Sequence, residues 1–158
     1  MDKYALARVI HVLAVVLWIG GVAMVTTVLI PAIRKLKSGG DQIELFERIE
    51  SRFAWQAKVT TLLAGLSGFY MLYYIDAWNR YLEPKFWWIH AMTMVWAIFM
   101  FVLFVAEPLF LHRLFKKHAL KDPVKTFALV HRLHLILLVL SLVTTAGGVA
   151  GSHGWFVV

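Results

Sequence analysis

The chain has 158 residues, of which 61% are hydrophobic, and its mean hydropathy is +0.73. A water-soluble domain of this length could not bury so much apolar surface, so the composition predicts a membrane protein. The formal net charge of +7 is explained by basic connections between apolar stretches and does not predict nucleic-acid binding, while the absence of cysteine excludes disulfides, thiolate-held iron–sulfur clusters and covalently attached haem.

Four apolar stretches without Asp, Glu, Lys or Arg follow one another along the chain. A helix needs about 20 mostly apolar residues to cross the hydrocarbon core, and three of the stretches reach that length. The second stretch is shorter, but it crosses if Trp55 and Lys58 lie at the interface. The prediction is one transmembrane domain over residues 1–158, with helices at about 5–31, 54–76, 85–117 and 123–150.

An amphipathic cytoplasmic helix is predicted between helices 1 and 2. Asp41 and Glu44 have the spacing of a capping box, and apolar residues from Ile43 to Phe53 follow at helical spacing. This helix should run into helix 2. Because the connections between helices are short, we expect an all-α, up-down-up-down four-helix bundle.

Two prolines bear on the later helices. Asp122 and Pro123 have the pattern of an N-cap and a first helical residue, so helix 4 should begin there. Pro108 can kink a membrane helix without ending it, and we therefore expect helix 3 to continue to Lys117.

Basic residues predict the orientation. Of the 16 Lys and Arg, 12 lie in residues 31–58 and 107–132, which should therefore be cytoplasmic by the positive-inside rule. Both termini would then face outward. The first apolar run is too long for a cleaved signal peptide and should remain as helix 1. We expect a multi-pass protein of a prokaryotic inner membrane.

His11 and His90 are the first candidate ligands. They lie on helices 1 and 3 at similar depth from the outer surface, since a helix rises about 1.5 Å per residue. Two imidazoles at one level of a bundle could hold a six-coordinate haem b between them. The alternative is two separate histidines, each donating to a backbone carbonyl. Arg8 could contact a haem propionate, or equally a lipid phosphate.

A second set of histidines lies toward the cytoplasmic side. If helices 3 and 4 pair antiparallel, His112 lies near the level of His131, and His134 lies one turn deeper. A second haem could bind among them, but interface histidines need no ligand, and we favour that simpler interpretation. Glu107, beside Pro108, is expected to pair with a basic side chain or to relay protons.

Copper is the alternative cofactor. Imidazole and thioether ligands suit Cu(I), and Met92 and Met94 follow His90 closely. Residues two apart on a helix point about 200° from one another, however, so the three cannot converge without another helix. Methionine as a core filler is the more common role.

The run from His11 through Trp18 to Gly21 resembles the first helix of the membrane superfamily that includes HemJ-type protoporphyrinogen oxidases and CopD-like copper-resistance proteins. The run from Trp88 through His90 to Met92 is similar to their third-helix Trp-x-His-x-Lys element. The resemblance implies a four-helix membrane fold, a functional role for His11 and position 92, and a cofactor near Trp18 and Gly21.

The chain also departs from that family. Position 92 is methionine instead of lysine, and residues 131–134, with two histidines, replace an Asn-Glu-x-Pro-like element of helix 4. These departures favour a haem-binding relative, similar to a small b-type membrane cytochrome, over protoporphyrinogen oxidation.

The sequence therefore predicts an integral membrane protein that binds one or two haem b groups and takes part in electron transfer, with a quinol or a redox protein as partner in the lipid bilayer. A copper-handling protein and a HemJ-like oxidase are the alternatives. No catalytic residue is assigned, and a homo-oligomer is left open.

Overall fold

The structure is a computed structural model that describes residues 2–155, and all regular secondary structure in that range is helical. In chain order its segments are α1 (Lys3–Met24), the π-helical η1 (Val25–Leu29), α2 (Ile30–Ile33), α3 (Gly39–Tyr74), the short 3₁₀ turns η2 (Trp78–Leu82) and η3 (Pro84–Phe86), α4 (Trp87–Phe101), the π-helical η4 (Val102–Leu111), α5 (His112–Lys121) and α6 (Pro123–Ser152).

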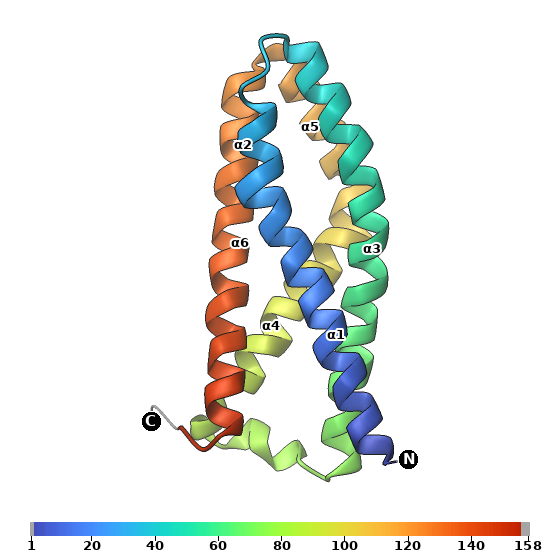
Figure 1. Cartoon of the computed structure of the whole chain (residues 1–158), viewed down its shortest axis with the longest axis vertical. Coiled ribbons are helices and arrows are strands. Elements are labelled where there is room, and N and C mark those ends of the chain that lie inside the picture. The colour runs from blue at the N-terminus through green and yellow to red at the C-terminus, as the bar shows by residue number, and fades with distance from the viewer. Residues whose placement is uncertain (1, 156–158) are drawn as a thin grey trace.

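These segments form four long rods that lie beside one another (Figure 1). The first rod joins α1, η1 and α2, the second is α3, the third joins α4, η4 and α5, and the fourth is α6. The connections from α2 to α3 and from α5 to α6 lie at the upper end of Figure 1. The beginning of α1, the end of α6 and the α3–α4 connection lie at the lower end. The closest pairs of rods are α1 with α3 and α4 with α6.

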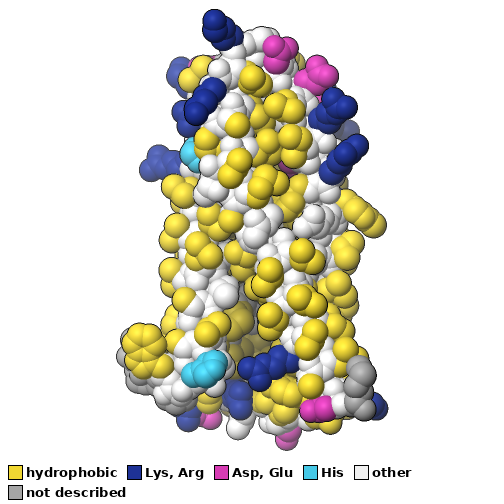
Figure 2. All heavy atoms as spheres, in the orientation of Figure 1, with side chains coloured by type: hydrophobic (Ala, Val, Ile, Leu, Met, Phe, Trp, Pro, Cys, Tyr) yellow, Lys and Arg dark blue, Asp and Glu magenta, His cyan; other side chains and the backbone are white. Residues whose placement is uncertain are grey.

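Three helices are long and apolar enough to cross a membrane: Lys3–Ile33, Pro84–Lys121 and Pro123–Ser152. Helix α3 is not among them, because its first half carries many charged side chains and only its second half is apolar. In Figure 2, charged side chains gather at both ends of the molecule, and hydrophobic side chains cover most of the length between them. This surface suits a protein that lies in a bilayer.

Helix caps fall close to their predicted places. Asp122 caps α6 by accepting a hydrogen bond from the Lys125 backbone N–H, and Pro123 is the first helical residue, as predicted. Helix α3 begins earlier than the Asp41 pattern suggested, because the hydroxyl of Ser38 accepts a hydrogen bond from the Asp41 N–H. The predicted connecting helix and the predicted helix 2 form one uninterrupted helix of 36 residues, α3.

Pro108 lies inside η4 and does not end the rod. Proline lacks the N–H that an α-helix needs, and a π-helical stretch is one way to accommodate the missing bond. The rod continues to Lys121, one turn beyond the predicted end at Lys117.

Two clusters of buried side chains hold the rods together. Near the upper end, the rings of Phe46, Phe115 and Phe127 interlock with centroids 5.0–5.6 Å apart. In the middle, the edge of Trp18 meets Phe99, with centroids 4.8 Å apart. Edge-to-face pairs are favoured because the positive rim of one ring meets the negative face of the other. The aromatic contacts thus join all four rods.

Candidate functional site

His11 projects from α1 against α3. Its Nδ1 lies 2.8 Å from the backbone oxygen of Ala64 and 3.3 Å from Oγ of Ser67. A carbonyl oxygen only accepts, so Nδ1 carries the proton and donates. The Ser67 hydroxyl donates to the carbonyl of Leu63, which leaves its lone pairs free to accept from His11 as well. In the neutral ring, Nε2 therefore keeps its lone pair and is the atom able to bind a metal.

His90 lies on an exposed face of α4, and the structure gives it a different neighbour. Its ring meets the ring of Tyr81 edge to face, with centroids 5.2 Å apart. The hydroxyl of Tyr81 is held by Thr93 at 2.7 Å. In the described part of the chain, no hydrogen bond or ring contact joins His90 to His11. Their sharing of one ligand therefore stays a prediction.

The three histidines of the second predicted set, His112, His131 and His134, have separate partners. Nε2 of His112 lies 3.9 Å from Glu47, and the guanidinium of Arg34 donates to Nδ1 of His131 over 3.4 Å. Nδ1 of His134 donates to the carbonyl of Val130 at 2.9 Å. His134 consequently has the same arrangement as His11, with Nε2 free, whereas Arg34 occupies the lone pair of His131.

Trp18 is almost completely buried, with 4% of its surface exposed, and its Nε1 has no hydrogen-bond partner in the described structure. It lies seven residues after His11, so the two side chains share a face of α1 about 10 Å apart along the axis. Gly21, one turn further, has no room for a Cβ because the ring of Phe53 lies against it. Arg8 is exposed near the start of α1.

Other glycines similarly receive large side chains from neighbouring helices. Trp96 packs over Gly65 and donates from Nε1 to the carbonyl of Thr61 at 2.9 Å. The methyl end of Met92 packs against Gly148 of α6. Gly65 and Gly148 thus serve close helix packing, and Met92 fills space between α4 and α6.

Glu107 pairs with Lys58, with 3.1 Å between Oε2 and Nζ. The predicted pairing of this carboxylate with a basic side chain is confirmed, and the partner is a lysine of α3. Each side chain of the pair is about one quarter exposed, so the pair lies at the edge of the protein rather than in its interior.

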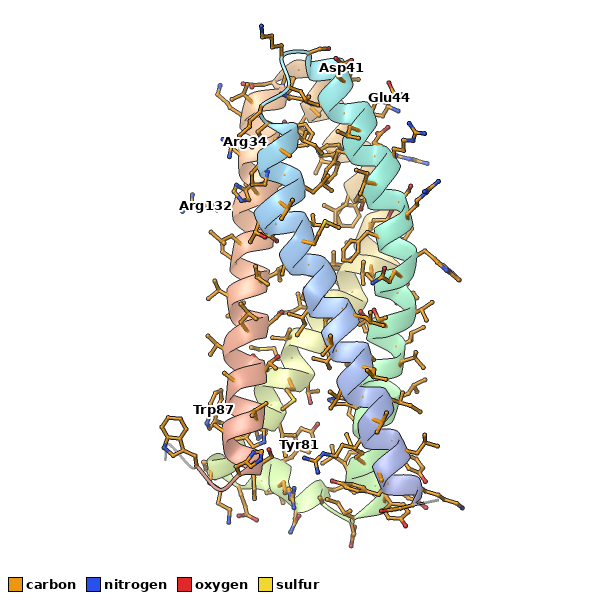
Figure 3. All side chains as sticks on the ribbon, viewed as in Figure 1. Arg34, Asp41, Glu44, Tyr81, Trp87 and Arg132 are labelled. Carbon is orange, nitrogen blue, oxygen red and sulfur yellow. The ribbon has the colours of Figure 1, made fainter. Side chains whose placement is uncertain are left out.

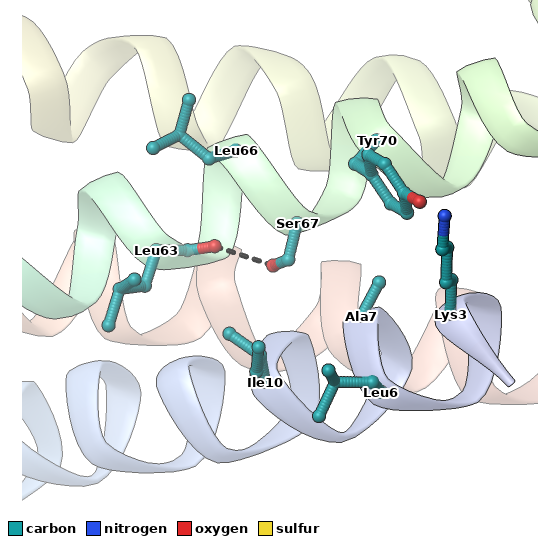
Figure 4. Close-up of a pocket in the computed structure, with 8 residues that line it drawn as sticks. All are labelled: Lys3, Leu6, Ala7, Ile10, Leu63, Leu66, Ser67 and Tyr70. Carbon is teal, nitrogen blue, oxygen red and sulfur yellow. Dashed lines mark hydrogen bonds between the residues drawn. The ribbon is translucent and has the colours of Figure 1, made fainter. Parts of the chain in front are cut away.

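A shallow groove of about 330 Å³ runs beside the His11 contact, between α1 and α3 (Figure 4). Its walls are mainly apolar, with Leu6, Ile10 and Leu66 among them. Ser67 lies in it, and Lys3 and Tyr70 lie at one end. The groove therefore reaches the hydroxyl that supports the His11 ring.

Residues 2–155 contain no group of three or more His, Asp or Glu side chains placed to hold a metal ion. This finding concerns metal ions held by protein side chains alone. It does not test haem binding, because a haem iron needs only one or two protein ligands. Comparisons of the chain with models of protein families, with curated proteins and with solved structures give no match. The function must therefore be argued from the chain's own residues.

No local pattern in the sequence indicates the partners of His11. Ala64 contributes a backbone oxygen, which every residue has, and Ser67 is one of many small polar residues in the apolar stretches. Only the pairing of α1 with α3 brings them to the imidazole.

Proposed function

We propose that this chain is a multi-pass inner-membrane protein that binds haem b and transfers electrons, with a quinol or a redox protein as its partner. The observation that carries the proposal is the anchoring of His11. An axial histidine usually donates its second ring N–H to a backbone carbonyl or carboxylate, which fixes the ring and raises its basicity. The Ala64 carbonyl has this role toward Nδ1, and Nε2 remains for iron.

The proposed topology follows from the charges. Arg34 and Arg132 lie toward the upper end of the bundle with Asp41 and Glu44, where the α2–α3 and α5–α6 connections are found (Figure 3). Twelve of the 16 basic residues belong to these connections and their flanks, so this end is cytoplasmic and both termini are outside. The apolar half of α3 is the fourth span of an up-down-up-down bundle, and its first half is an amphipathic cytoplasmic extension.

The residues present suit a haem in specific ways. His11 offers a fixed Nε2, and the buried Trp18 offers an N–H donor that no group among residues 2–155 satisfies. His90 is the proposed second ligand. For a second haem, His134 is a better ligand than His131, because its Nδ1 is a donor to backbone and its Nε2 is free. When bound, the haem supplies the one-electron chemistry, while the chain holds its ligands and excludes water.

The first test is the optical spectrum of the purified full chain. We expect a Soret band and sharp α and β bands after reduction with dithionite. Haem extracted into pyridine and quantified against protein mass separates one haem from two. A colourless protein that binds Cu(I) tightly would overturn the haem assignment in favour of copper.

The second test is His11→Ala, with His153→Ala as the matched control. Nδ1 of His153 also donates to a backbone carbonyl, that of Val149 at 2.8 Å, but the residue is exposed at the end of α6. We expect His11→Ala to lose the low-spin spectrum or convert it to high spin, and His153→Ala to keep it. A full low-spin spectrum in His11→Ala would reject His11 as a ligand.

A further inference from the structure

A cleft of about 450 Å³ lies between α3 and the segment that joins η4 to α5. Its lining includes Glu47, Glu50, Trp55 and Lys58 from α3, with Glu107 and His112 opposite them. The cleft lies at the end of the bundle that carries most of the basic residues and is separate from the His11 contact. Its volume falls in the range of small-molecule sites.

Negative charge is in excess in this cleft. Lys58 neutralises Glu107 at 3.1 Å. Glu47 has weaker charge contacts, with Oε1 3.7 Å from Nζ of Lys116 and 3.9 Å from Nε2 of His112. Neither distance is that of a hydrogen bond, and this buried oxygen has no donor within the described structure.

Glu50 is the third carboxylate, and among residues 2–155 no ion pair within 4.0 Å or hydrogen bond reaches its side chain. Burial raises the pKa of Glu50, and the nearby Glu107 raises it further; His112 and Lys58 lower it by less, and the raising effect of Glu47 is the smallest. A site with two carboxylates lacking close donors is complementary to a cation that brings several N–H groups.

An apolar face continues from the cleft along α3. Trp55, which is 72% exposed, is followed at helical spacing by Val59, Leu62 and Leu66, all of them exposed. Tryptophan is typical of the boundary between headgroups and hydrocarbon. The cleft therefore lies where charged surface gives way to apolar surface, at the depth of a lipid headgroup, and acyl chains would lie along this face.

We propose that the cleft binds the headgroup of an aminophospholipid, phosphatidylethanolamine, with Glu47 and Glu50 accepting hydrogen bonds from its ammonium and the face from Trp55 to Leu66 carrying an acyl chain. A primary ammonium has three N–H donors, which are enough for both carboxylates, and its one positive charge offsets part of their negative charge. An isolated metal ion is a poorer occupant, since the described side chains offer no set of three ligands. The proposal requires the chain to lie in a bilayer but not to bind haem.

The test compares two lipids that differ in their donors. The purified full chain is titrated in detergent with phosphatidylethanolamine or with phosphatidylcholine of the same acyl chains, and thermal unfolding is followed. Choline has a charge but no N–H, so only phosphatidylethanolamine should raise Tm in a saturable way. Soluble phosphoethanolamine should compete with the lipid at millimolar concentration. Equal stabilisation by both lipids would overturn the proposal.

Variants locate the site. Glu50→Gln should weaken the apparent affinity for phosphatidylethanolamine by about tenfold or more, the effect expected from loss of a hydrogen bond to a charged group. Glu44→Gln is the matched control, because Glu44 is exposed on the same helix outside the cleft. Glu47→Gln is a second cleft variant should Glu50→Gln fail to fold. Unchanged affinity for phosphatidylethanolamine in a folded cleft variant would refute the proposed lipid site, whether or not the protein shows a haem spectrum.

Discussion

The Gly68→Ala substitution tests the His11 contact directly. A Cβ at position 68 would lie 3.2 Å from Cε1 and 3.4 Å from Nδ1 of the imidazole. Carbon atoms pack at about 3.5–4.0 Å, so the ring must withdraw by about 0.3–0.8 Å. The hydrogen bond from Nδ1 to Ala64, now 2.8 Å, would then approach or exceed about 3.2 Å, the usual limit for N–H···O bonds. Losing it costs about 0.5–1.5 kcal/mol.

Gly20→Ala is the control, because nothing lies within 4 Å of a Cβ built there. Alanine is favoured over glycine in a helix by up to about 1 kcal/mol at either position, so the comparison cancels this gain. We expect Gly68→Ala to be less stable than Gly20→Ala by about 1 kcal/mol, which is about 2–4 °C in Tm for a chain of this size. The measurement is thermal unfolding in one detergent without added cofactor. If Gly68→Ala is as stable as Gly20→Ala, the imidazole is not held as described.

Substitutions at two further positions, Glu50 and Trp18, test other parts of the structure. For Glu50, the raised pKa means that the charged carboxylate is unfavourable in the fold, so the stability of the protein should fall as pH rises from the ordinary carboxyl pKa of about 4.3 to the raised value. Glu50→Gln removes this fall. As pH rises through that window, the Tm of Glu50→Gln should therefore increase relative to the Tm of the unmodified protein. A constant difference in Tm between the two proteins would contradict the placement of Glu50. For Trp18, replacement by alanine should cost about 3–5 kcal/mol through the cavity it leaves, while phenylalanine should cost clearly less, because it keeps a ring against Phe99 and removes an unpaired N–H. Thermal unfolding of both variants decides, and equal losses would show that the ring contact contributes little.

Helix positions were predictable because apolar runs and caps are local signals. The predicted helices at about 85–117 and 123–150 agree with rods that end at Lys121 and Ser152. The π-helical geometry around Pro108 was not predictable, since it depends on how the freed carbonyls find donors in the folded rod. The start of α3 was placed too late, because Ser38 competes with Asp41 as the cap and only the fold selects between them.

For the candidate site, only the types of residue involved were predictable from the sequence. A histidine deep in an apolar run must find a partner, and His11 has one in the carbonyl of Ala64. Which carbonyl it would be depends on the register between α1 and α3, and a backbone group leaves no mark in the sequence. The Lys58–Glu107 pair has the same origin, because 49 positions separate the two residues and only packing brings them together.

Helix α3 is one continuous helix that reaches both the cleft and the His11 contact. Its 36 residues span about 54 Å without a break, and they carry both Glu50 in the cleft and Ala64 at the imidazole, about 21 Å apart along the axis. Tilting α3 by only 2° about its cleft end would move the Ala64 oxygen by roughly 0.7 Å. This shift exceeds the range over which the length of an N–H···O hydrogen bond usually varies. A tilt of α3 at the cleft would therefore alter the hydrogen bond between the Ala64 carbonyl and the His11 ring.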